Sequence, residues 1–196
     1  MARGSGFTLR PDDPRTFPEW IRHRARIGGD KVAAEVNGVV RTYAELDHTT
    51  DCTSAGFASL GLEQGAHVSV MMQNSIENID AWFGLQKAGI VEVPVHTASR
   101  GGALRYIVDH ADAEALVVDE LFLPHVAAVI DELPKVKQVI VNRNEPGEGN
   151  VDLPSRVAVH NLADLYSTGG PVPMPTVRRG DTAVVLHSSG TTGPPK

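Results

Sequence analysis

Short apolar runs alternate with helix-length segments through the middle of the chain, and this alternation limits the fold more than any other feature. Each run has the length of a buried strand, and each intervening segment is long enough for a crossover helix. Parallel strands need such crossovers, so the pattern predicts an α/β fold with a mostly parallel sheet. The expected strands are 68–72, 90–93, 115–118, 136–141 and 157–159, and the expected helices are 75–87, one from about 103, 121–131 and 162–165.

Two local signals precede that alternation. An Asn-Gly pair at 37–38 stands between two β-prone runs, which is typical of a tight hairpin turn. Thr42 and Glu45 have the spacing of a capping box and predict the start of a long helix. A shorter helix is expected to open at Phe17, and residues 1–16 are expected to be a flexible N-terminus.

Composition excludes several classes of function. The 196 residues are 41% hydrophobic, which is enough to bury a core. The net charge is −6 and no large basic cluster is present, so nucleic acid is not an expected partner. No apolar stretch is long enough to span a membrane, no secretory signal is visible, and a single Cys52 is ordinary for a reducing compartment. We therefore expect a cytoplasmic protein.

One expected helix gathers side chains that could bind a metal, namely Asp47, His48, Asp51 and Cys52. On a helix only neighbours four apart, such as Asp47 and Asp51, share a face. Zinc requires convergent His and Cys ligands. A solvated helix surface is therefore favoured over a metal site.

The last nine residues have the composition of a phosphate-cradling loop, with the sequence Ser188-Ser189-Gly190-Thr191-Thr192-Gly193-Pro194-Pro195-Lys196. Two glycines three apart let backbone amides converge on an anion, the hydroxyls add donors, and the prolines restrict the backbone ahead of the lysine ammonium. The spacing differs from that of a Walker A motif. The apolar run 183–186 is expected to be a buried strand that delivers the loop. Phosphate binding is favoured over an ordinary polar surface loop.

This nine-residue string resembles the phosphate-loop signature of the AMP-forming adenylating enzymes, the superfamily of AMP-dependent synthetases and ligases that includes acyl- and aryl-CoA synthetases. The likeness continues upstream through the segments 42–46, 61–68, 73–77 and 87–94. Residues 82–89 and 181–183 are most similar to the crotonobetaine/carnitine-CoA ligase-like branch, which points to fatty acid or carnitine metabolism. Two positions depart from the signature: Ser188 replaces its first threonine and His187 replaces an aromatic residue.

The resemblance implies a fold, a reaction and binding roles. Residues 17–196 would form the first part of the large N-terminal domain of an acyl-CoA synthetase-like fold, truncated at the phosphate loop. A small-molecule carboxylic acid would attack the α-phosphate of ATP to give an acyl-adenylate and pyrophosphate, and the thiol of CoA would then displace AMP. By position, the residues that would grip the β- and γ-phosphates are Ser188, Ser189, Gly190, Thr191, Thr192, Gly193 and Lys196.

In this family the Mg²⁺ ligand and the catalytic lysine lie further along the sequence, so neither is expected in this chain, which should not complete adenylation alone. His187 could sense nucleotide charge or line the acyl or adenylate pocket, or it could be a strand-end side chain satisfied by the backbone. Two other functions stay open. One is a short non-catalytic nucleotide- or phosphate-binding module, and the other is a peptide-synthetase adenylation domain that acylates a carrier protein.

Overall fold

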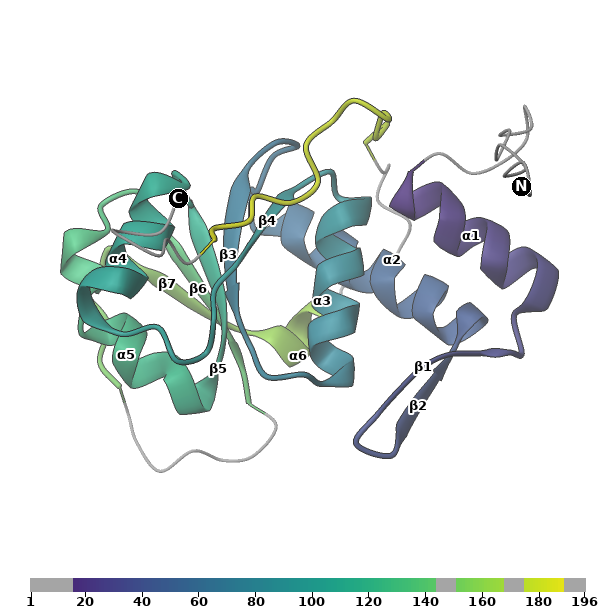
Figure 1. Ribbon diagram of the computed structural model, residues 1–196, viewed down its shortest axis with the longest axis horizontal. Coiled ribbons are helices and arrows are strands. Elements are labelled where there is room, and N and C mark those ends of the chain that lie inside the picture. Colours follow the sequence, from purple (N-terminus) through teal and green to yellow (C-terminus); the bar gives the residue numbers. More distant parts are fainter. Residues whose placement is uncertain (1–15, 144–150, 168–174, 189–196) are drawn as a thin grey trace, which may run out of the picture.

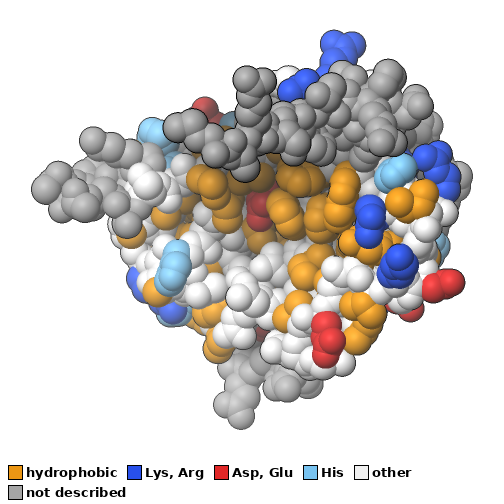
Figure 2. Space-filling view, turned by 45° about the vertical axis from the view of Figure 1, so that its right-hand side comes forward, with side chains coloured by type: hydrophobic (Ala, Val, Ile, Leu, Met, Phe, Trp, Pro, Cys, Tyr) orange, Lys and Arg blue, Asp and Glu red, His pale blue; other side chains and the backbone are white. Residues whose placement is uncertain are grey.

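The computed structural model describes residues 16–143, 151–167 and 175–188 (Figure 1). These residues form a five-stranded parallel sheet with helices on both faces, together with a separate two-stranded hairpin. The predicted α/β class is confirmed. The surface carries a band of hydrophobic side chains with an acidic side chain among them (Figure 2). Among the described residues, no helix has the length and apolar character needed to cross a membrane.

The sheet has the strand order β4-β3-β5-β6-β7. Its strands are β3 (His67–Met71), β4 (Val91–Pro94), β5 (Ala115–Asp119), β6 (Gln138–Asn142) and β7 (Ala158–Asn161). The chain runs from β3 outward to β4 and then returns past β3 to β5. The two crossover helices, α3 (Ile76–Lys87) and α4 (Gly101–His110), therefore pack on opposite faces.

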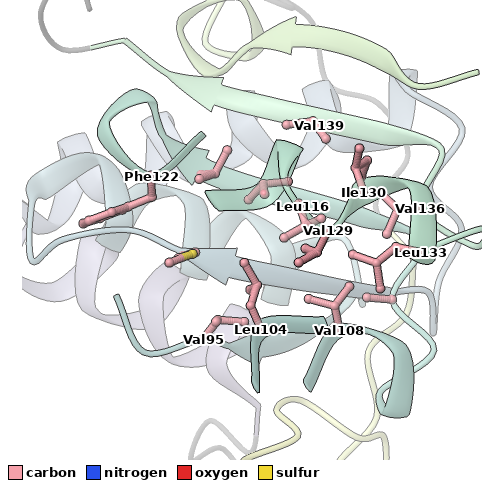
Figure 3. Packing of buried hydrophobic residues seen from close by; sticks show 14 of the residues in the cluster. Val95, Leu104, Val108, Leu116, Phe122, Val129, Ile130, Leu133, Val136 and Val139 are labelled. Atoms are coloured by element: carbon pink, nitrogen blue, oxygen red, sulfur yellow. The ribbon is translucent and has the colours of Figure 1, made fainter. Parts of the chain in front are cut away.

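Successive side chains of each buried strand point to opposite faces and build two cores. In β5, Leu116 and Val118 join the core beneath α4 and α5 (Leu123–Ala127). Figure 3 shows Leu116 among the other buried hydrophobic residues of this core. Val117 joins the core beneath α2 (Tyr43–Ser59), α3 and α6 (Leu162–Leu165). Both faces of the central strands β3, β5 and β6 are covered, so their residues are mostly buried and these strands lack a solvent-facing polar side.

The predicted hairpin is confirmed as β1 (Val32–Val36) paired with β2 (Val39–Thr42). Asn37 and Gly38 have φ angles of 52° and 79°, so both turn residues take the left-handed conformation that tight hairpins need. The helix α1 (Phe17–Gly28) precedes the hairpin and α2 follows it.

Side-chain caps begin four of the described helices, α1, α2, α3 and α6; Asn161 caps α6 by accepting from the backbone N–H of Ala163. Thr42 and Glu45 form the predicted capping box of α2, and Ser75 caps α3 through the backbone N–H of Asn78 at 3.1 Å. A second capping box, Thr16 with Glu19, begins α1; its spacing is visible in the sequence, but sequence reasoning missed it.

The single helix predicted over 121–131 is wrong. The structure divides this stretch into a 3₁₀ turn η1 (Glu120–Phe122), the five-residue α5, and a second 3₁₀ turn η2 (Ile130–Glu132). Pro124 lies in the first turn of α5, where a proline is tolerated. Its ring disfavours helical backbone in the residue before it, so a helix that starts at 121 cannot run through this position. Phe122, Leu123, Val126, Val129 and Ile130 still reach the core, whereas Leu121 is exposed, so the hydrophobic pattern predicted most of the burial correctly and the helix length incorrectly.

The packing of α2 on α3 changes the interpretation of Asp47 and Asp51. The two share a face, as predicted, but that face holds the fully buried ammonium of Lys87. Lys87 Nζ lies 2.7 Å from Asp47 Oδ1, 2.7 Å from the Asp47 carbonyl oxygen and 2.7 Å from Asp51 Oδ1. These carboxylates are structural ion-pair partners and not merely a solvated surface.

Candidate phosphate-binding site

The segment that precedes the predicted loop lies against the outer edge of β4. It forms one parallel bridge, in which the Glu92 N–H donates to the Ala183 carbonyl at 3.0 Å and the Val185 N–H donates to the Glu92 carbonyl at 2.8 Å. Gln86 Nε2 of α3 also donates to the Ala183 carbonyl, at 2.9 Å. Leu186 is 75% exposed. The prediction of a buried strand over 183–186 is therefore wrong, because pairing with an edge strand at one position leaves the outer side of this segment uncovered.

A tight turn anchors the start of the same segment. The Arg178 N–H donates to Asp181 Oδ2 at 2.7 Å, and the Asp181 N–H returns to the Arg178 carbonyl at 3.0 Å. Gln64 Nε2 donates to the Thr176 carbonyl at 3.3 Å. The turn borders a cavity of about 460 Å³ whose apolar wall comes from α1 and α3, through Phe17, Pro18, Trp20 and Phe83.

His187 lies beside the C-terminal end of α4. Its Nε2 is 3.3 Å from Nδ1 of His110, whose ring stacks on Tyr106 with the ring centroids 5.1 Å apart. Burial, and secondarily the neighbouring His110, lowers the pKa of His187, while its Nδ1 is buried without a hydrogen-bond partner. The side chain of His187 thus contacts another imidazole. Within the described residues, it does not make the hydrogen bond to a backbone group that is expected for a purely structural residue at a strand end. The pocket role proposed for it stays a prediction.

The structure describes Ser188 alone among the predicted phosphate ligands, and this residue is exposed. The others, Ser189, Gly190, Thr191, Thr192, Gly193 and Lys196, lie outside the described residues. Their role in binding ATP phosphates stays a prediction. Within the described ranges no group of three or more His, Cys, Asp or Glu side chains could hold a metal ion.

Sequence reasoning missed a second cavity, of about 410 Å³, beside β4. Glu92 lines it, and burial raises the pKa of this carboxyl to about 7. A charged residue inside an otherwise apolar strand run, Ile90-Val91-Glu92-Val93, was the signal that could have revealed it.

Comparison with known proteins decides the family. The profile of the AMP-binding enzymes matches residues 21–196. The chain belongs to the AMP-binding enzyme family. Among curated relatives, the 2,3-dihydroxybenzoate-AMP ligase of Bacillus subtilis (strain 168) is 29% identical, with 96% of this chain and 36% of the relative covered. The crotonobetaine/carnitine–CoA ligase of Salmonella paratyphi A is 30% identical over 88% of this chain and 34% of the relative.

Solved structures agree with this family. The apo structure of Mycobacterium smegmatis MbtA has a TM-score of 0.79 at 30% identity and covers 94% of this chain and 33% of that protein. The anthranilate CoA ligase AuaEII has a TM-score of 0.80 at 22% identity, a likeness of fold that covers 94% of this chain and 34% of that chain. The chain therefore spans about a third of the length of the relatives it matches. Its sheet corresponds to the first part of the N-terminal domain of adenylate-forming ligases.

Proposed function

We propose that this AMP-binding family chain is the ATP-phosphate-binding part of an AMP-forming acid–CoA ligase. The reactants would be a small-molecule carboxylic acid, ATP and CoA, and the protein would act in the cytoplasm. The observation that carries the proposal is the complete string from Ser188 to Lys196, within a chain whose family match extends over residues 21–196. The likeness to crotonobetaine/carnitine–CoA ligase, at 30% identity, supports CoA as the acceptor.

The chemistry assigned to the loop is electrostatic. Hydroxyl and amide donors, with the ammonium of Lys196, would surround the β- and γ-phosphates and stabilise the charge that develops as pyrophosphate leaves. The family uses Mg²⁺ with ATP, and the described residues contribute no ligand cluster for it. The role of this chain would be to bind and orient the leaving group, and, as the family resemblance implies, the Mg²⁺ ligand would lie further along the sequence.

Binding of pyrophosphate and ATP tests the phosphate role directly. Isothermal titration calorimetry on the chain should show that Lys196→Ala weakens pyrophosphate binding by roughly tenfold, the worth of one charge-assisted hydrogen bond. Lys31→Ala, which removes an exposed lysine outside the loop, is the matched control and should bind as the parent does. Equal affinities for the two variants would contradict the assigned role.

A second candidate acceptor is a carrier protein. The similarity to a 2,3-dihydroxybenzoate-AMP ligase, at 29% identity, is nearly equal to that with the CoA ligase, so identity alone does not choose between them. In the full-length gene product, acid-dependent exchange of pyrophosphate into ATP reports adenylation, and release of AMP on adding CoA reports thioester formation. Exchange without CoA-dependent AMP release favours the carrier protein, and binding without exchange favours a non-catalytic module.

A further inference from the structure

We propose that the 410 Å³ cavity beside β4 binds a small organic cation, an ammonium group on an apolar body, with Glu92 as its counter-ion. The cavity lies between α3, β4 and the segment that bridges to β4. Its lining consists of Asn78, Ile79, Trp82, Glu92, Pro94, Val184 and Leu186. Its volume falls in the range of sites for small molecules. The proposal does not depend on the phosphate loop or on the proposed ligase activity.

Glu92 is the first observation that points to a ligand. The residue is only 7% exposed and lines the cavity, and none of the described side chains donates a hydrogen bond or forms an ion pair with its carboxylate. Burial is the sole cause of its raised pKa, and no charged group in the described part of the chain offsets it. A buried carboxylate without a partner is costly, and a cationic ligand would remove that cost.

Other buried charges in this fold do have partners, which makes Glu92 the exception. Asp80 is fully buried, and its Oδ2 lies 3.0 Å from Arg41 Nη2 and 3.4 Å from the Tyr166 hydroxyl. Lys87 is held by two aspartates. The fold therefore supplies opposite charge or hydrogen bonds to the buried ionised groups Asp80 and Lys87, and the residues that the structure describes supply neither to Glu92.

The other walls define the class of ligand. Ile79, Pro94, Val184 and Leu186 give apolar surface, and Trp82 adds an aromatic ring of the kind that attracts ammonium groups. The described residues that line the cavity include no Lys, Arg or His, which disfavours an anion. Mg²⁺ or Ca²⁺ here would have to take most of its oxygen ligands from water, and the apolar walls disfavour such a hydrated ion. An alkylammonium ion satisfies both the charge and the apolar walls.

Binding should depend on pH through Glu92. The carboxylate form of Glu92 binds the cation. With a pKa of about 7, Glu92 is mostly protonated and neutral at pH 6 and mostly ionised at pH 8. No other titratable side chain from α3, β4 or the bridging segment lines the cavity. The affinity for a cation should therefore rise roughly tenfold between pH 6 and pH 8, in proportion to the ionised fraction.

Calorimetric titration of the full chain with three probes of equal chain length tests the proposal: hexylammonium, hexyltrimethylammonium and hexan-1-ol. At pH 8 both cations should bind at least about tenfold more tightly than the alcohol. Glu92→Gln should weaken cation binding by about tenfold while leaving alcohol binding unchanged. The exposed Glu63→Gln is the matched control and should bind as the parent does.

Several results would overturn the proposal. These are equal cation affinity in Glu92→Gln and the parent, an alcohol that binds as tightly as the ammonium ions, or no cation binding at pH 8 by a chain whose circular dichroism shows it folded. The comparison of probes and the pH dependence need only the parent chain, so they decide the matter even if Glu92→Gln fails to fold. Loss of ATP binding in Lys196→Ala leaves all these outcomes unchanged, which separates this proposal from the ligase function.

Discussion

Replacing Gly84 with alanine tests the packing of α2 on α3, the helix pair that supports one face of the sheet. A Cβ at position 84 would lie 2.2 Å from Thr53 Oγ1 and 2.9 Å from Thr53 Cβ. Both distances are shorter than 3.0 Å, a separation that real Cβ atoms essentially never show to other heavy atoms, and Thr53 belongs to the facing helix α2. Rotation of Thr53 moves Oγ1 but not Cβ, so the substitution should force the two helices apart.

The magnitude follows from opposing terms. Overpacking of a tight interface costs about 1–3 kcal/mol. Moving Thr53 also weakens the bond from its hydroxyl to the Asp80 carbonyl, now 3.2 Å, which is worth about 1 kcal/mol. Alanine is a better helix former than glycine by about 1 kcal/mol. The net expectation is a loss of about 2 kcal/mol in the free energy of unfolding, or about 4–8 °C in Tm for a chain of this size.

Thermal and urea unfolding, followed by circular dichroism, measure this loss. Gly102→Ala is the matched control, because Gly102 is also helical and nothing lies within 4 Å of its added Cβ; it should leave Tm unchanged or raise it. In a Thr53→Ala background the cost of Gly84→Ala should shrink, since the clash with Oγ1 is gone. A Gly84→Ala variant as stable as the parent, or a cost that is the same in both backgrounds, would refute the reasoning.

Three further predictions concern the other buried or capped groups. The pKa of Glu92 rises from 4.5 to about 7 on folding, so the free energy of unfolding of the parent should fall as pH rises through this window. Glu92→Gln should therefore be as stable as the parent near pH 4.5 and more stable by about 3 kcal/mol above pH 8. Urea unfolding at each pH measures this difference. Lys87→Met should cost about 2 kcal/mol in the same assay, because it leaves Asp47 without a cation and Asp51 with only the exposed Arg22, 3.8 Å away; an unchanged midpoint would argue against the Lys87 ion pairs. Ser75→Ala should cost about 1 kcal/mol through loss of the α3 cap, whereas Ser75→Gly should cost only a few tenths; equal losses would count against the cap.

Signals that lie within a few residues of one another were predictable from the sequence. The Asn37-Gly38 turn, the Thr42 capping box and the Ser75 cap are all present, because each depends on backbone groups at most three residues away. The alternation of strands and helices also predicted the α/β class, since buried strands and crossover helices differ in length and in the spacing of their apolar residues.

Helix length and edge pairing were not predictable in the same way. The stretch 121–131 has helical spacing of apolar residues, yet only five of its residues are α-helical, because its fold depends on Pro124 and on packing against the strands. The run 183–186 has the composition of a buried strand, but it pairs with β4 at one residue only. Composition reports which side chains prefer burial, and tertiary contacts decide how much of that preference is met.

Pairing of buried charges is where sequence reasoning fails most instructively. The partners of Lys87 lie 40 and 36 residues away, and those of Asp80 lie 39 and 86 residues away, so no local pattern announces them. Glu92 looks no different in the sequence, yet its carboxylate meets no such partner among the described residues. The distinction between a structural charge and one that awaits a ligand therefore exists only in three dimensions. It is this distinction, and not the mere presence of a charged residue in an apolar strand, that assigns a cation to the cavity beside β4.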